Sequence, residues 1–171
     1  MIVKDENENE LIDILKISEN EIDSYSPVSH ALLIVKMGDD YLFGWNHFRN
    51  SWEIFGGCIE KNETSRECIV REANEELGLE NTDFTFIGLI KYKMPPNYFN
   101  PERHIEYGGL YGITLPKSKL DAIRTHRKDK AEIERLSLYS DIHDKENISI
   151  IAEKLLEYWQ QPVGCSYPSR Q

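Results

Sequence analysis

The sequence contains few cysteines and no long hydrophobic run, and both absences limit what the protein can be. Its three cysteines, Cys58, Cys68 and Cys165, are odd in number and match no spacing typical of a metal site. A reducing cytoplasm is therefore the expected compartment. No hydrophobic run approaches the roughly 18 residues of a transmembrane helix, and the first residues lack the pattern of a signal peptide. We therefore expect no membrane association.

Positive charge is also scarce, with 20 basic against 30 acidic residues and a formal net charge of −10. This balance argues against a nucleic-acid polymer as the main partner, because binding to a phosphate backbone relies on a basic surface. A small phosphorylated substrate stays compatible, since bound metal ions can reverse the field of an acidic cleft. The charge thus favours a small-molecule partner.

The length of 171 residues and the 40% hydrophobic content predict one soluble domain, residues 1–171, with a core of its own. Residues 1–10 are acidic and polar, and we expect them to form a solvated, mobile end. Hydrophobic runs predict strands at residues 30–36, 41–45, 52–55, 83–92, 105–115 and 133–139. Residues 11–15 form a strand or a helical turn, and residues 117–131 are basic and polar.

Two segments have the pattern of helices. Thr64 followed by Glu67 predicts a capping box, and Gly78 predicts a left-handed C-terminal residue, so the first helix covers about residues 64–77. Asn147 is expected to cap a second helix, which has a hydrophobic stripe and ends before Pro162. Strands alternating with two helices predict an α/β/α sandwich with a mixed sheet.

The first predicted helix carries three carboxylates on one face. Glu72, Glu75 and Glu76 have the spacing i, i+3 and i+4, so their side chains emerge together. Like charges at these spacings repel by roughly 0.2–0.5 kcal/mol per pair. A divalent cation removes that penalty, and Mg²⁺ prefers carboxylate oxygens. The alternative is a charged, solvated face of an ordinary surface helix.

The residues before this helix favour the cation site. Gly57, Glu63, Arg71 and the three acids form the pattern G-x5-E-x7-R-E-A-x-E-E-x-G-L, which ends at Leu79. This pattern resembles the signature box of the Nudix hydrolases at every position that carries chemistry. Phe55 departs from it, because the family commonly has proline before the two glycines. The resemblance also implies the Nudix-type fold, with a helix on each face of the sheet.

The resemblance implies hydrolysis of a pyrophosphate bond in a nucleoside diphosphate derivative, with Mg²⁺ or Mn²⁺ as cofactor. It assigns the metal to the carbonyl of Gly57 and to carboxylates, with Glu75, Glu72 and Arg71 as the catalytic group. The expected metal ligands are Gly57, Glu63, Glu72, Glu75 and Glu76. Bound metal would neutralise phosphate oxygens and lower the pKa of a water molecule. Arg71 is expected to orient a neighbouring carboxylate.

The general base and the substrate stay open from the sequence. The base is Glu72 or Glu75, or an acid beyond the box; those candidates are Glu102, Glu106, Asp129, Glu132 and Glu134. We expect Trp52, Arg103 and Tyr98 to contact the substrate through ring stacking or phosphate binding. A nucleoside triphosphate, ADP-ribose and a nucleotide sugar are equally compatible, and a homodimer is compatible with the resemblance.

Two other functions fit the same fold. An isopentenyl-diphosphate isomerase-like enzyme needs a cysteine facing an acid across its pocket, and Cys58 lies at the box. Its histidine-rich metal site has no counterpart here. A non-catalytic nucleotide-binding module usually loses acids of the box, whereas this chain keeps them all. The hydrolase is therefore the favoured interpretation.

Overall fold

The sheet is the centre of the architecture in the computed structural model, which describes residues 1–159. It has nine strands in the order β1-β2-β7-β8-β3-β4-β5, with β6 beside β3 and β9 beside β4. The pair β3–β8 is parallel and the other pairs are antiparallel. The expected mixed sheet is therefore confirmed. The strands are β1 (Val3–Lys4), β2 (Glu10–Leu15), β3 (Val28–Met37), β4 (Asp40–Asn46), β5 (Ser51–Glu53), β6 (Phe55–Cys58), β7 (Thr85–Met94), β8 (His104–Leu115) and β9 (Ile133–Leu138).

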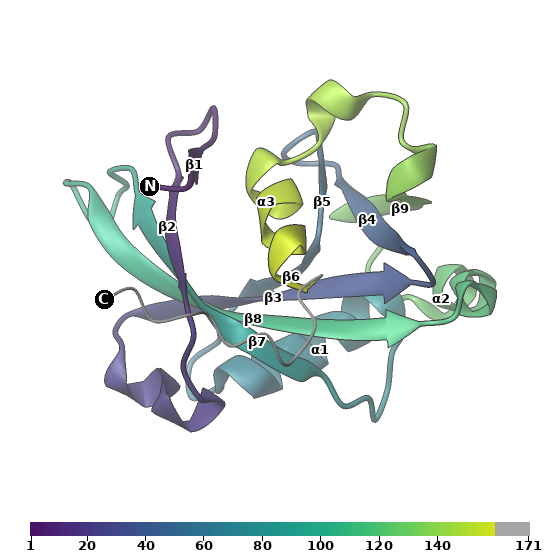
Figure 1. Ribbon diagram of the computed structural model, residues 1–171, viewed down its shortest axis with the longest axis horizontal. Coiled ribbons are helices and arrows are strands. Elements are labelled where there is room, and N and C mark those ends of the chain that lie inside the picture. Colours follow the sequence, from purple (N-terminus) through teal and green to yellow (C-terminus); the bar gives the residue numbers. More distant parts are fainter. Residues whose placement is uncertain (160–171) are drawn as a thin grey trace, which may run out of the picture.

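The two longer helices cover opposite faces of this sheet (Figure 1). The α-helices are α1 (Ser65–Leu77), α2 (Leu120–His126) and α3 (Ile150–Trp159). Four 3₁₀ turns complete residues 1–159: η1 (Glu19–Ser24), η2 (Lys117–Lys119), η3 (Tyr139–Asp141) and η4 (Lys145–Asn147). None of the helices in this part of the chain is long and hydrophobic enough to cross a membrane. The arrangement is the predicted sandwich.

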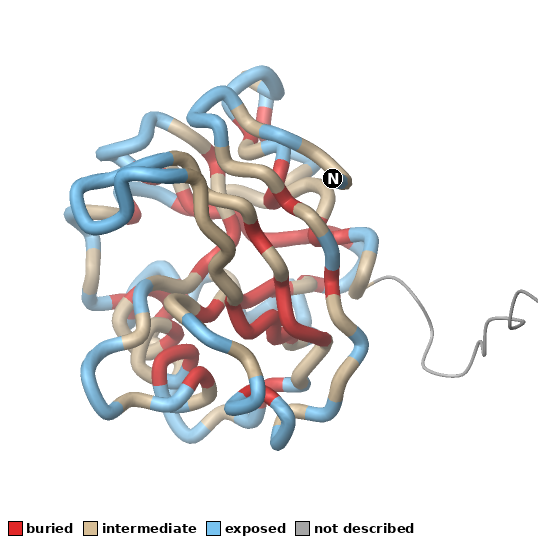
Figure 2. The backbone as a smooth tube through the Cα atoms, turned by 90° about the vertical axis from the view of Figure 1, so that its left-hand side faces the viewer, coloured by how far each residue is buried: buried red, intermediate tan, exposed pale blue. Residues whose placement is uncertain are grey.

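Strand β3 builds both halves of the core because successive side chains point to opposite faces of the sheet. Ala31, Leu33 and Val35 pack with α1, whereas Leu32 and Ile34 face α3. Figure 2 shows the buried residues gathered in the middle of the molecule, with exposed loops around them. The first half of β3 pairs with β6, so the loop before α1 starts at the centre of the sheet.

The first helix forms as its local signals predict. The Thr64 side chain accepts a hydrogen bond from the backbone N–H of Glu67, and the Glu67 carboxylate accepts one from the N–H of Thr64. Gly78 ends the helix in the left-handed conformation, with φ of 65°. The capping box and the C-terminal glycine are both confirmed.

Three other expectations needed the structure. Residues 11–15 belong to strand β2, which settles the open choice. The prediction of Asn147 as helix cap is wrong, because Asn147 lies in η4 and Ser149 Oγ accepts the N–H of Ala152 instead. The basic segment 117–131 contains α2, which the sequence pattern did not predict. Pro162 lies outside the described residues.

We expect Thr64→Ala to lower the free energy of unfolding by about 1 kcal/mol, because an N-terminal donor of α1 loses its acceptor. Urea denaturation followed by circular dichroism measures the change. Thr125→Ala is the matched control, since its exposed hydroxyl bonds only to the carbonyl of Asp121 within α2. Equal effects of the two substitutions would contradict a stabilising capping box.

Candidate active site

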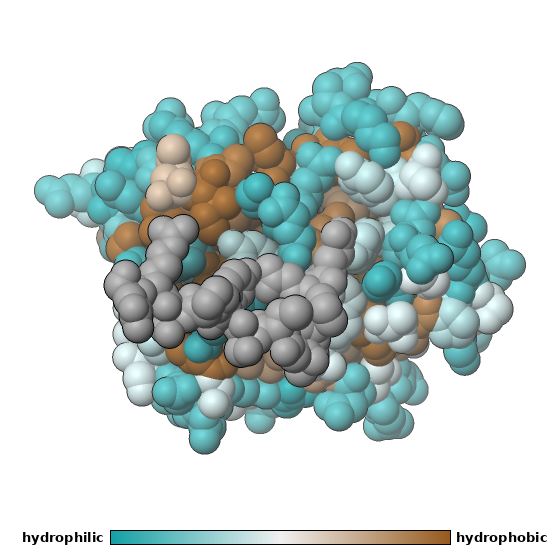
Figure 3. Space-filling model, viewed as in Figure 1, coloured by the Kyte–Doolittle hydropathy of each residue, from teal (hydrophilic) through white to brown (hydrophobic). Residues whose placement is uncertain are grey.

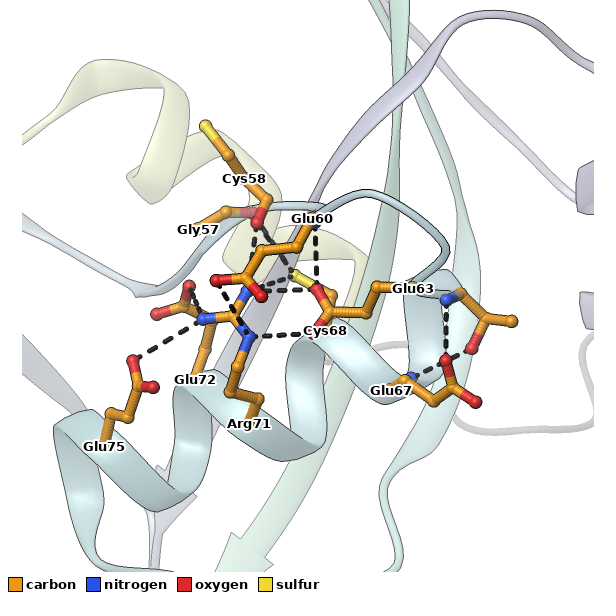
Figure 4. Close-up of polar contacts among 10 residues, drawn as sticks. Gly57, Cys58, Glu60, Glu63, Glu67, Cys68, Arg71, Glu72 and Glu75 are labelled. Carbon is orange, nitrogen blue, oxygen red and sulfur yellow. Dashed lines mark hydrogen bonds and ion pairs between the residues drawn. The ribbon is translucent and has the colours of Figure 1, made fainter.

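Arg71 lies at the centre of the predicted acidic site (Figure 4). Its Nε and Nη2 donate to the two carboxylate oxygens of Glu63 at 2.8 and 3.0 Å. Nη1 donates to Glu72 at 2.7 Å and to Glu75 at 3.5 Å, and Nη2 also donates to the carbonyl of Cys58 at 3.1 Å. One guanidinium therefore holds three carboxylates and the loop before α1 together.

Glu63 is the acid that Arg71 holds most firmly. The pair is bidentate, which is the strongest geometry for arginine and a carboxylate. These hydrogen bonds lower the pKa of Glu63 to about 2. They also raise the pKa of Arg71, although its partial burial opposes this. Glu63 thus stays charged and fixes the orientation of the guanidinium, which suggests a supporting role at the site.

Glu72 and Gly57 are close enough to act on one ion. A Cβ on Gly57 would lie 2.3 Å from Oε1 of Glu72, so the carboxylate occupies the space that a side chain would fill. Burial raises the pKa of Glu72, while the bond from Arg71 opposes the shift. The Gly57 carbonyl also accepts a weak hydrogen bond from the thiol of Cys68 at 3.6 Å. A side chain at position 57 would therefore displace the Glu72 carboxylate from its place against the backbone.

Glu76 is the most buried acid of the helix, with 3% of its surface exposed. Its Oε2 accepts a hydrogen bond from the backbone N–H of Gly56 at 2.9 Å. Burial raises the pKa of Glu76 well above its usual range, and the negative charges of Glu72, Glu132 and Asp129 add to the effect. A single backbone N–H leaves this carboxylate short of positive charge. A bound cation would supply it.

Glu75 is the most exposed of the three helix acids, with 47% of its side chain accessible. Within residues 1–159, its carboxylate accepts a hydrogen bond from Arg71 alone, at 3.5 Å. Its backbone carbonyl accepts hydrogen bonds from the N–H groups of Lys128 and Asp129, at 2.9 and 2.8 Å. The loop between α2 and β9 is thereby attached to the C-terminal end of α1.

That attachment brings two acids from beyond the box toward the helix. Glu132 interacts electrostatically with both Glu72 and Glu76, and Asp129 interacts with Glu76. The other three candidates for an acid beyond the box have different surroundings. Glu106 bonds to Ser29 and His104, Glu134 contacts His47 at 3.6 Å, and Glu102 is exposed.

The structure also adds Arg49, which the sequence analysis did not identify. Arg49 binds Glu53 through two hydrogen bonds of 2.8 Å and contacts Glu132 at 3.4 Å. The hydrogen bonds that Arg49 donates to Glu53 raise the pKa of Arg49, and the charge of Glu76 contributes to the shift. The fully buried Asn46 donates to Glu132 at 3.1 Å. The one sequence signal for the surroundings of Arg49 is Asn46, a polar residue at the end of a hydrophobic strand.

The three residues predicted to contact the substrate lie in different surroundings. Trp52 is buried in the core beside α3, and its indole N–H donates to Asp144. Tyr98 is 94% exposed in the loop between β7 and β8. Arg103 forms ion pairs with Glu8 and Glu10, at 3.3 and 2.9 Å. Their contact with substrate stays a prediction.

The donor set fits a hard divalent cation. The carbonyl of Gly57 and the carboxylates of Glu72, Glu75 and Glu76 are the oxygen ligands that Mg²⁺ and Mn²⁺ prefer. Gly57 and Glu72 approach each other as the glycine contact shows. Within residues 1–159, however, no group of three or more acidic, histidine or cysteine side chains is preassembled around one point. Among these carboxylates, Glu72 already accepts a hydrogen bond from Arg71, and Glu76 accepts one from the N–H of Gly56.

This fold and this acidic helix define the family. The profile of the NUDIX domain matches residues 26–153, which is most of the chain. The chain therefore belongs to the Nudix family, and the resemblance noted in the sequence is confirmed.

Two curated relatives share shorter segments. An 8-oxo-dGTP diphosphatase of Proteus vulgaris is 33% identical over 60 residues, which cover 35% of this chain and 48% of that protein. An RNA pyrophosphohydrolase of Hydrogenovibrio crunogenus is 30% identical over 71 residues, 42% of each chain. The chain thus spans less than half the length of the curated relatives it matches.

Solved structures support the fold over a longer range. The pyrophosphohydrolase BsRppH of Bacillus subtilis aligns with a TM-score of 0.59 and 18% identity, over 92% of both chains. A MutT Nudix hydrolase of Burkholderia pseudomallei aligns with a TM-score of 0.54 and 15% identity, over 75% of this chain and 95% of that one. At these identities the likeness concerns the fold alone.

The burial of Glu76 predicts that removing its charge stabilises the fold, by an amount that depends on pH. Because the folded pKa lies above 4.5, folding is penalised once the pH rises past 4.5 and the unfolded chain ionises. In chelator at pH 7, Glu76→Gln should raise the free energy of unfolding by about 1 kcal/mol, and the gain should vanish below pH 4. Urea denaturation across pH measures it. A loss at pH 7 would contradict the account.

Glu63→Gln should have the opposite sign. Its folded pKa of about 2 lies below the ordinary 4.5, so its carboxylate stabilises the fold above pH 4.5. That stabilisation is lost as the pH falls from 4.5 through 2. We expect a loss of about 1 kcal/mol at pH 7 that shrinks in acid. A loss that does not change with pH would show that the ion pair with Arg71 is not its cause.

Proposed function

We propose that the protein is a divalent-metal-dependent Nudix hydrolase that cleaves a pyrophosphate bond in a nucleoside diphosphate derivative. The observation that carries this proposal is the packing of the Glu72 carboxylate against the Gly57 backbone, beside the buried and undercompensated Glu76. The relatives' names support the reaction type, since one is a diphosphatase and two are pyrophosphohydrolases.

In this proposal Gly57, Glu72, Glu75 and Glu76 hold Mg²⁺ or Mn²⁺. The bound cation would neutralise phosphate charge and acidify a water molecule. Glu63 supports the site through Arg71, whose guanidinium is already committed to Glu63 and Glu72. Arg71 therefore orients these carboxylates and offsets their mutual repulsion. The proposal thus keeps for Arg71 the orienting role expected from the sequence.

Glu75 is our first choice for the group that accepts a proton from water. It is the most exposed of the helix acids and the one that Arg71 holds at the longest distance, so its oxygens are the freest to accept a proton. Glu132 is the second choice, because its charge acts on both Glu72 and Glu76 from the loop before β9. Substitution of each acid in turn distinguishes these two candidates for the base.

The cysteine chemistry of an isomerase finds no support in this geometry. The thiol of Cys58 points away from the carboxylates around Arg71 (Figure 4). Burial raises the pKa of Cys68 to about 12, so that its thiol stays protonated. An activity assay distinguishes the hydrolase from a nucleotide-binding module without activity.

We expect metal-dependent phosphate release from at least one compound of a panel with nucleoside triphosphates, ADP-ribose, nucleotide sugars and a short RNA with a 5′-triphosphate. The assay measures phosphate after phosphatase coupling, with Mg²⁺, with Mn²⁺ and with chelator. Release that chelator leaves unchanged would contradict the metal site. Release from the RNA alone would overturn the expectation that no polymer binds.

Glu75→Gln should lower the rate by at least about 10²-fold if Glu75 is the base or a ligand. Glu132→Gln tests the second choice. Glu134→Gln, two residues further along in β9 and facing His47, is the matched control. A normal rate for both Glu75→Gln and Glu132→Gln would exclude both as the base. Full activity of a Glu72→Gln, Glu76→Gln double variant would contradict the whole mechanism.

A further inference from the structure

A pocket of about 510 Å³ lies on the α3 side of the sheet. The segment joining β1 and β2 forms one wall, and residues 49–53 together with 146–151, where α3 begins, form the other. His30, Leu32, Tyr92 and Met94 of the sheet line its floor. Figure 3 shows hydrophobic residues gathered between the β1–β2 segment and α3, with hydrophilic residues around them. A volume of this size is typical of a small-molecule site.

The pocket adjoins the acidic site through one strand pair. His30 and Leu32 of β3 pair with Cys58 and Gly56 of β6, which are the neighbours of Gly57 in the chain. Arg49 lines the pocket and also interacts electrostatically with Glu76. A substrate whose pyrophosphate lies at Gly57 can therefore extend into the pocket.

The charges of the lining exclude phosphate as the occupant. Four carboxylates line the pocket, those of Asp5, Glu6, Glu53 and Glu146. Its two cations are already paired, Lys4 with Glu8 at 3.0 Å and Arg49 with Glu53 at 2.8 Å. A net acidic lining repels a phosphate chain and suits an uncharged group that carries N–H donors.

Tyr92 offers a hydrogen-bond donor on the pocket floor. Its residue is only 5% exposed, and its hydroxyl has no hydrogen-bond partner among residues 1–159. Burial raises the pKa of this hydroxyl, so that it remains protonated at neutral pH. Because the Tyr92 hydroxyl lines the pocket and has no partner within residues 1–159, it is free to donate a hydrogen bond to a ligand there.

His30 offers an acceptor beside it, with the two rings 4.9 Å apart. Burial lowers the pKa of His30 to about 4, so its ring is neutral. Ser29 Oγ lies 2.9 Å from Nδ1 of His30 and donates its proton to Glu106 at 2.6 Å. The hydroxyl has one proton, so it accepts from Nδ1–H, and Nε2 of His30 carries the lone pair.

The Glu106 carboxylate fixes the direction of the hydrogen bonds that run from His30 through Ser29. Its burial alone would raise its pKa, but the hydrogen bonds from Ser29 and His104 lower it overall. It therefore stays an acceptor. Gly108 gives the His30 ring its place, because a Cβ there would lie 2.6 Å from Nε2. Nε2 has no hydrogen-bond partner among the described residues, like the hydroxyl of Tyr92.

We propose that this pocket binds the nucleobase of the substrate, and that Tyr92 and His30 select a guanine-type edge. The hydroxyl of Tyr92 would donate to the C6 carbonyl, and Nε2 of His30 would accept from the N1–H beside it. The 2-amino group then faces the acceptor-rich lining. Uracil places a second carbonyl there and is disfavoured. The inference rests on the proposed hydrolase function for its substrate, but its test does not need activity.

The test titrates guanosine, inosine, adenosine and uridine into the full chain in chelator, followed by ¹⁵N chemical shifts. We expect guanosine to bind most tightly and uridine most weakly, with shifts in residues 5–9 and 146–151. Tyr92→Phe should weaken guanosine at least about fivefold. Tyr25→Phe, which changes a tyrosine outside the pocket that packs against Tyr107, should change nothing. Glu106→Gln should weaken guanosine less than Tyr92→Phe, because it acts only through Ser29 and His30.

Absence of guanosine binding, equal binding of uridine, or an unchanged affinity in Tyr92→Phe would overturn the inference. Folding is controlled by thermal unfolding of Tyr92→Phe, which should match the wild type or exceed it, because the lost hydroxyl has no partner. The phosphate-release assay keeps the two proposals apart. Hydrolysis without preference for a nucleobase contradicts only the proposal for the pocket. Guanosine binding without any hydrolysis contradicts only the proposed function.

Discussion

The ion pairs of Arg71 are the constraint on which the site depends. Helix α1 carries three acids that repel one another, and Glu63 from the preceding loop adds a fourth charge. One guanidinium neutralises part of this charge, and it ties the loop to the helix through Glu63 and the carbonyl of Cys58. The remaining negative charge lies on Glu76 and Glu75. This imbalance is what makes a divalent cation the natural further partner.

The sheet gives these acids their position. Because β6 pairs with the first half of β3, Gly57 lies where the Glu72 carboxylate can reach its backbone. The same strand pair places His30 beside Cys58 on the opposite face. One short strand therefore separates the acidic site from the pocket, and each side of it serves a different part of one extended substrate in our proposals.

The sequence predicted features whose causes are local. The capping box of α1, its terminal glycine and the spacing of its acids lie within 16 residues, and all appear in the structure. Most strands were also predicted, because their hydrophobic runs are long. The cap of α3 was assigned to Asn147 instead of Ser149, since both residue types cap helices and only the backbone decides between them.

Features that depend on distant contacts were out of reach. Five acids beyond the box looked alike in the sequence, and only the attachment of the loop to Glu75 brings Asp129 and Glu132 toward Glu76. The pairing of His30 with Tyr92 joins strands that are about 60 residues apart in the chain. No local pattern marks such a pair.

Anomalous diffraction from a crystal soaked in Mn²⁺ tests the central claim most directly. The account predicts a manganese peak within coordination distance of the carbonyl oxygen of Gly57 and of carboxylate oxygens of Glu72 and Glu76. It also predicts that Glu63 keeps its bidentate bond to Arg71. A soaked crystal with no peak among these oxygens, and with Glu72 and Glu76 unmoved, would contradict it.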